Sequence, residues 1–158
     1  MVCHILRTKG AVLSVWGRAQ LADLDEIARN LDLAVAESGG PIVSVSILPA
    51  GVPPADDSVR AHLLELMPKI LGHCSTAHVV FEGEGFLSAI KRGVLTGLLH
   101  ATRRQHVFHV HSQLASVLEM MKGKEGAAAV TNLMQLARQR GYLDLTARDL
   151  DPISRRAV

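Results

Sequence analysis

The sequence predicts an α/β protein: a mainly parallel sheet of about five strands with helices packed on it, and an extra C-terminal helix. Two observations indicate this class. Short β-branched runs with the period of a strand alternate with longer stretches in which apolar residues recur every three or four positions, the period of a helix. Strands that alternate with helices form parallel sheets with right-handed crossovers.

The first half of the chain predicts a hairpin, a helix and a strand. Two apolar runs, 2–7 and 11–16, flank a turn in which Gly10 permits the backbone angle of a tight hairpin. From position 21 apolar residues recur at helical spacing until Ser38-Gly39-Gly40 ends the pattern. The run Ile42–Leu48 is rich in Val and Ile, alternates with serines and is bounded by Gly-Pro and Pro-Ala-Gly, which is typical of a strand.

The second half predicts four helices and two strands. Ser112 is the expected cap of the third of these helices, and Gly141 is the expected stop of the last. The tail 143–158 shows only weak periodicity. In chain order the elements are a helix at about 58–71, a strand at 77–81, a helix at about 86–101, a strand at 106–111, and helices at 112–121 and about 125–140.

Composition bounds the class of protein. A chain of 158 residues that is 48% hydrophobic and 20% charged is one domain with a sizeable core. The net charge of +2 comes without a clustered basic face, and 3% aromatic residues cannot build a base-stacking platform, so no nucleic-acid partner is expected.

Three further observations favour a cytoplasmic protein. Two cysteines cannot build a disulfide framework. The N-terminus lacks the charged and apolar regions of a signal peptide. No stretch approaches the roughly 20 apolar residues that a membrane span needs, so no membrane span is expected.

The order of elements through about Met121 resembles the STAS fold, the domain of anti-sigma-factor antagonists and SpoIIAA-like proteins. The segment Val107–Met121, VFHVHSQLASVLEMM, is similar to the last strand and capped helix of that family. The resemblance implies a bacterial regulatory domain at 1–122 in which successive strands are neighbours and all helices sit on one face. A C-terminal helix and tail at 123–158 would pack on the same domain.

The resemblance also implies a candidate phosphoacceptor. In the antagonists, a serine at the start of the helix after the third strand is phosphorylated by a partner kinase. The matching segment here, Asp57-Ser58-Val59-Arg60, keeps the Asp-Ser pair but lacks the second Ser and the Gly of that family. From the residues alone, Ser58 is the expected N-cap of the helix, and the aspartates beside it would repel an added phosphate.

Four acidic residues are candidate partner contacts. Asp56 and Asp57 close the proline-rich loop after Ile42–Leu48, while Glu82 and Glu84 lie in the turn after the next strand. The carboxyl ends of parallel neighbouring strands meet at one edge of a sheet. The resemblance implies that these loops lie near a partner surface.

His109 and His111 share one face of the last predicted strand because side chains alternate along a strand. Two imidazoles at this spacing can share zinc or another transition metal if a third ligand joins them. No Cys-x-x-Cys or His-Glu-x-x-His pattern accompanies them. Candidate third ligands are His78, His4, His73 and Cys74.

The same alternation predicts a semi-polar face of the sheet. If all helices cover one face, the opposite face would carry the polar members of the strands. Solvent or the extra C-terminal helix is its favoured cover, ahead of a homodimer contact and of a metal or ligand site. The residues of this face are Ser14, Trp16, Ser44, Ser46, His109 and His111.

We expect a non-enzymatic regulatory or scaffold module that acts through protein–protein contacts, with an unidentified protein partner and a homodimer as a further candidate. The alternative is a protein that binds a small apolar ligand or a metal ion on the His109/His111 face. An enzyme is the less favoured class, since the sequence contains no Gly-x-Ser-x-Gly elbow and no phosphate-binding glycine motif.

Overall fold

An antiparallel hairpin opens the fold, as the two apolar runs predict. The computed structural model describes residues 3–53, 55–82 and 106–144. Within them, β1 (His4–Thr8) pairs with β2 (Ala11–Val15). Gly10 in the turn has φ +87°, in the left-handed region that glycine reaches without steric cost.

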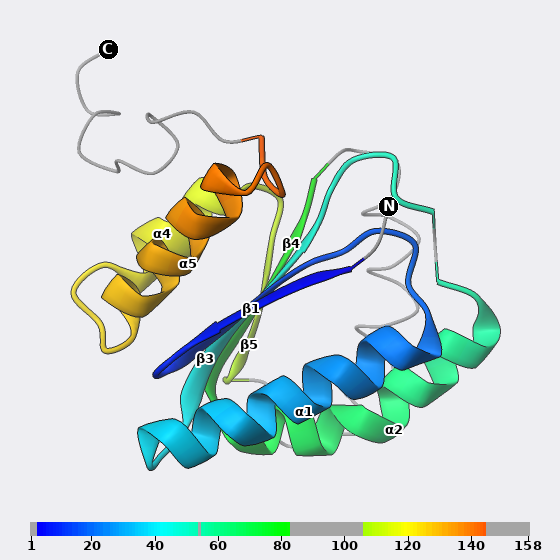
Figure 1. The fold of residues 1–158 in the computed structure, drawn as a ribbon, viewed down its shortest axis with the longest axis horizontal. Coiled ribbons are helices and arrows are strands. Elements are labelled where there is room, and N and C mark those ends of the chain that lie inside the picture. Colours follow the sequence, from blue (N-terminus) through cyan, green and yellow to red (C-terminus); the bar gives the residue numbers. More distant parts are fainter. Residues whose placement is uncertain (1–2, 54, 83–105, 145–158) are drawn as a thin grey trace.

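The sheet has the strand order β1-β2-β3-β4-β5, and the strands from β2 to β5 are parallel (Figure 1). The α/β class and the mainly parallel five-stranded sheet are therefore confirmed, and successive strands are neighbours as expected. The predicted helix at about 86–101 lies outside the described residues. The elements after β2 are α1 (Leu21–Ser38), β3 (Ile42–Leu48), α2 (Asp57–His73), β4 (Cys74–Phe81), β5 (Phe108–His111), α4 (Leu114–Met121) and α5 (Ala127–Gln139).

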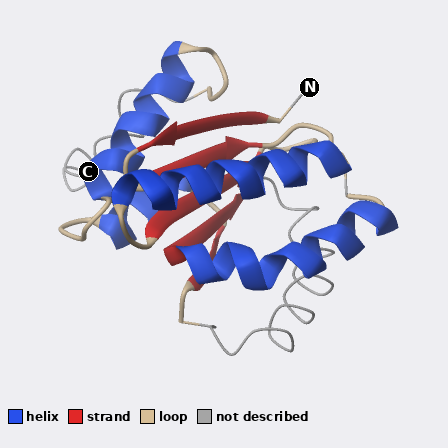
Figure 2. Cartoon of the chain, turned by 60° about the horizontal axis from the view of Figure 1, so that its bottom comes forward, coloured by secondary structure: helices blue, strands red, loops and turns tan. Residues whose placement is uncertain are grey.

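Helices α1 and α2 pack side by side on one face of the sheet (Figure 2). Both connect neighbouring parallel strands, and right-handed crossovers that step in one direction place their helices on the same side. Leu24 and Leu31 of α1 are buried there with Val12 and Ile42 from the strands and with Trp16, which follows β2.

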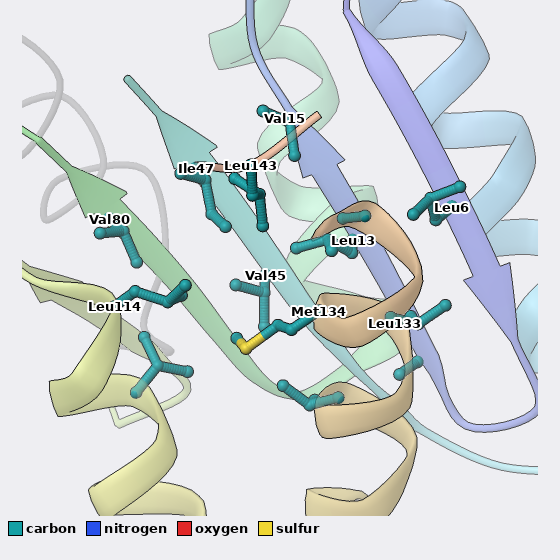
Figure 3. Packing of buried hydrophobic residues seen from close by; sticks show 14 of the residues in the cluster. Leu6, Leu13, Val15, Val45, Ile47, Val80, Leu114, Leu133, Met134 and Leu143 are labelled. Atoms are coloured by element: carbon teal, nitrogen blue, oxygen red, sulfur yellow. The ribbon is translucent and has the colours of Figure 1, made fainter. Parts of the chain in front are cut away.

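Helices α4 and α5 cover the opposite face, so the expectation that all helices lie on one face is wrong. Leu13, Val45 and Ile47 of the strands meet Met134 of α5 in one core (Figure 3). A parallel sheet whose faces are both apolar is normally covered on both sides. Neither α4 nor α5 connects two of the described strands, so the crossover rule does not fix their side.

The polar residues of β2 and β3 lie under α1 and α2, away from the histidines of β5. Ser14 and Ser46 alternate with residues of the α4–α5 core, and their hydroxyl oxygens are 2.8 Å apart, a hydrogen bond. Ser44 and Trp16 lie on the same side by the same alternation. The predicted semi-polar face, which joined these residues to the β5 histidines, is therefore wrong. The reason is that the valine side of β3 packs against α4 and α5.

Candidate functional site

The carboxyl ends of β2, β3 and β4 bring three loops to one edge of the sheet (Figure 1). The backbone N–H of Trp16 donates to the backbone carbonyl of Ile47 at 2.8 Å. The Glu82 N–H donates to the Leu48 carbonyl at 2.9 Å. These bonds hold the segments that leave the strands against one another. We call residues 17–20, 49–53, 55–58 and 82 the carboxyl edge.

Helix α2 begins at the carboxyl edge, and Asp56 caps it. The Asp56 Oδ1 accepts from the Val59 N–H at 2.9 Å and from the Ser58 hydroxyl at 2.6 Å. These two donors, with the Arg18 guanidinium, lower the pKa of Asp56. The predicted N-cap role of Ser58 is wrong, because Ser58 lies in the first turn of the helix and donates to the residue that caps it.

The other predicted contact residues lie on the surface of this edge, except Glu84, which is outside the described residues. The Asp57 side chain is 93% exposed and pairs with Arg60, while Glu82 is half-buried. Arg18 is exposed beside Asp56 and was not predicted. The available signal was its position in the segment that follows β2, which ends at the same edge.

His78, His109 and His111 meet on the face that α4 covers. Parallel pairing of β4 with β5 sets His78 beside His109, with their ring centroids 5.2 Å apart. Nδ1 of His78 and Nε2 of His111 are 3.0 Å apart, a hydrogen bond in which one nitrogen donates. Nε2 of His78 lies 3.2 Å from the Thr76 hydroxyl. The sheet thus brings His78, one of the candidate third ligands, to the two histidines that the strand pattern placed on one face, and we call the three residues the histidine cluster.

The histidine cluster does not fit a metal ion. In the described part of the chain, no group of three or more His, Cys, Asp or Glu side chains is arranged to hold one. The facing nitrogens of His78 and His111 are hydrogen-bond partners, so they point at each other and not at a common third point.

The other candidate ligands lie elsewhere. His4 stacks on Tyr142 with ring centroids 3.8 Å apart, at the far strand of the sheet. His73 is 2.7 Å from Asp32 of α1. Cys74 is buried in the core beneath α1 and α2. The structure therefore supplies none of these side chains to the histidine cluster.

Burial lowers the pKa of each histidine in the cluster. His78 is 1% exposed, and its pKa is lowered from 6.5 to about 4 by burial first and then by His111, His109 and Lys124. The pKa of His109 and that of His111 are also lowered, again with burial as the largest cause. The three imidazoles are therefore neutral at neutral pH.

Both cysteines are buried without a disulfide partner. Burial raises the pKa of the Cys3 thiol and of the Cys74 thiol to about 12. A thiol that stays protonated is a poor nucleophile and a poor metal ligand. Cys3 and Cys74 therefore act as packing residues at neutral pH.

No family model, curated protein or solved structure matches the chain. Among the helices of the described ranges, none combines the length and apolar character needed to cross a membrane.

Proposed function

We propose that the protein is a non-enzymatic regulatory or scaffold module that docks a protein partner on its carboxyl edge, in the manner of the STAS and SpoIIAA-like proteins it resembles. One observation carries this proposal: the hydrogen bond of 2.9 Å from the Glu82 N–H to the Leu48 carbonyl sets the segment after β4 against the loop after β3. Loops positioned by a rigid sheet are common recognition surfaces.

The chemistry of the edge favours a polar protein surface as its partner. Arg18, Asp57 and Ser58 are exposed there, so the edge offers charges of both signs and an exposed hydroxyl that is hydrogen-bonded to Asp56. Such groups set orientation and partner choice at an interface more than they set raw affinity. The edge therefore suits reversible docking.

Ser58 is the residue through which we propose this edge is regulated. Its exposed hydroxyl is held by Asp56 at 2.6 Å. A phosphate there would gain from the N-terminus of α2 but would be repelled by the carboxylates of Asp56 and Asp57. The Ser58–Asp56 bond would break, and the shape and charge of the edge would change.

Charge reversal at the edge tests the proposal. Cross-linking first identifies the proteins that the wild-type chain binds. The double variant Asp57→Lys with Glu82→Lys should weaken its binding to those proteins by about tenfold or more, because both loops would carry a positive charge in place of a negative one. Glu119→Lys, on the exposed side of α4, is the matched control and should keep wild-type binding. If the double variant keeps every interaction of the wild type, the docking proposal is wrong.

The alternative function is binding of a small apolar ligand or metal ion on the His109/His111 face. The meeting of three histidines is the observation in its favour, but the hydrogen bond between His78 and His111 opposes a shared metal ion. The cover of that face by α4 and α5 opposes it. An excess of Zn²⁺ should raise the melting temperature if the native state binds it. The homodimer stays a prediction, which sedimentation equilibrium tests.

A further inference from the structure

The histidine cluster lies on the face of the sheet that α4 and α5 cover, beneath α4, and the groups around it are apolar or positive. From α4, Leu114, Val117, Leu118 and Met121 are buried toward the sheet, and Met121 contacts the Thr76 hydroxyl. Helix α5 packs beside α4 and over β1 and β2, where its buried residues are Val130, Leu133, Met134 and Ala137. Lys124, in the loop between the two helices, adds a positive charge that acts on His78 and His109.

No negative charge balances the cluster within the described residues. The groups that act electrostatically on the three histidines are the histidines themselves and Lys124. The carboxylate of α4, Glu119, is on its exposed side. A proton taken up by the cluster would therefore be a buried positive charge among other positive charges.

The hydrogen bond between His78 and His111 adds a chemical limit. One of the two facing nitrogens must keep its lone pair to accept the bond at 3.0 Å. One added proton can be shared across the pair, but a second would place two N–H donors against each other. The packed arrangement thus requires neutral or singly protonated imidazoles.

We infer that the histidine cluster is an acid-sensitive latch, which holds α4 and α5 on the sheet while the imidazoles are neutral and releases the two helices when the imidazoles take up protons. This inference is independent of the docking proposed at the carboxyl edge. Release would uncover the apolar side of β2 and β3, where Leu13, Val45 and Ile47 lie.

The pH window follows from the direction of the pKa shifts. The folded pKa of His78 is about 4, below the ordinary value of 6.5 that the opened chain would have. The opened form therefore binds protons more readily, and stability that is complete above about pH 6.5 is lost as the pH falls toward the folded value. For each such histidine, the opening equilibrium constant rises by up to about tenfold per pH unit in that window.

Hydrogen exchange followed by mass spectrometry tests the latch in the full chain. Between about pH 7.5 and about pH 5, after correction for intrinsic exchange, amides of α4 and α5 should lose protection while amides of α1 and α2 keep it. Equal loss in both layers, or no loss in either, would overturn the latch.

Two charge-reversal variants isolate the cause. Lys124→Glu places a carboxylate where a positive charge now acts on His78 and His109, so release should need a lower pH. Lys122→Glu makes the same change at another exposed position of the loop and should leave the wild-type response. If both variants behave alike, the cluster does not cause the release.

His111→Gln tests the cluster directly. It keeps an amide for the bond to His78 but cannot titrate, so it should also reduce the loss of protection in α4 and α5 at low pH.

Discussion

Gly126 lies where the loop before α5 meets the sheet. It has φ +86°, and a Cβ built there would lie 2.6 Å from Cγ2 of Val43. Gly126→Ala should therefore lose about 1–2 kcal/mol to left-handed backbone strain and about 1–3 kcal/mol more to overpacking. Urea denaturation measures the sum.

Gly39→Ala is the matched control for this prediction. Gly39 has φ +75° at the end of α1, with no atom within 4 Å of a Cβ built there. It should show the strain alone. Equal losses in the two variants would mean that the contact with Val43 has no energetic weight.

The cap of α2 gives a second prediction. Asp56→Ala should lower the urea midpoint more than Ser58→Ala, because Asp56 accepts two hydrogen bonds and Ser58 donates only one of them. The folded pKa of Asp56 is lowered, so its contribution is present above its ordinary value of 3.8 and is lost as the pH falls through the folded value. The two variants should therefore converge in strong acid, and an equal midpoint at neutral pH would contradict the cap assignment.

Some roles of single residues could be predicted from the sequence, and others could not. Asp56, Asp57 and Ser58 are all good cap residues, so sequence reasoning located the helix start but chose the wrong cap. The alternation along β5 correctly set His109 and His111 on one face. Their depth of burial could not be predicted, because it depends on which helices cover that face.

At the scale of elements, α1 and α2 are joined by ion pairs along their exposed sides. Nε2 of His62 is 2.8 Å from Asp25, and Nζ of Lys69 is 2.8 Å from Asp32. The hydrogen bond to Asp25 is the largest cause that raises the pKa of His62, and Glu65 adds to it. This histidine thus responds to pH in the opposite sense to the histidine cluster.

His62→Gln should therefore destabilise the protein in mild acid and have little effect in base. The stabilisation by His62 is complete below its ordinary pKa of 6.5 and is lost as the pH rises through the raised folded value. Melting temperatures at about pH 6 and about pH 9 measure the difference. His106→Gln, at an exposed position before β5, controls for removal of an imidazole, and a pH-independent effect of His62→Gln would contradict the ion pair.

Helical and strand periods predicted the kind and order of the described elements, but not the side on which each helix packs. Val43 and Ser44 are neighbours on β3, and both are buried because helices cover both faces. A single helical layer would leave one face of the sheet open, and under that expectation the serines and the β5 histidines were predicted to share it. A periodicity shows that two faces differ, and only the packing shows what covers each.

At the scale of the whole molecule, one sheet separates two apolar cores. Along β2, Val12 belongs to the core under α1 and α2, and Leu13 belongs to the core under α4 and α5. Because the same strands serve both cores, unfolding at neutral pH should be a single cooperative transition. The acid-sensitive latch acts on one core only, so acid should separate the two layers.

Two spectroscopic probes can detect that separation. Trp16 is the one tryptophan of the chain and is buried in the α1–α2 core, so its fluorescence reports on that layer. Far-UV circular dichroism reports on all helices. The two urea transitions should coincide at neutral pH, whereas at about pH 5 the dichroism should fall at lower urea, since α4 and α5 leave while the surroundings of Trp16 persist. Coincident transitions at both pH values would show that the two layers unfold together. In that case protonation of the histidine cluster would not release α4 and α5 separately from the rest of the fold.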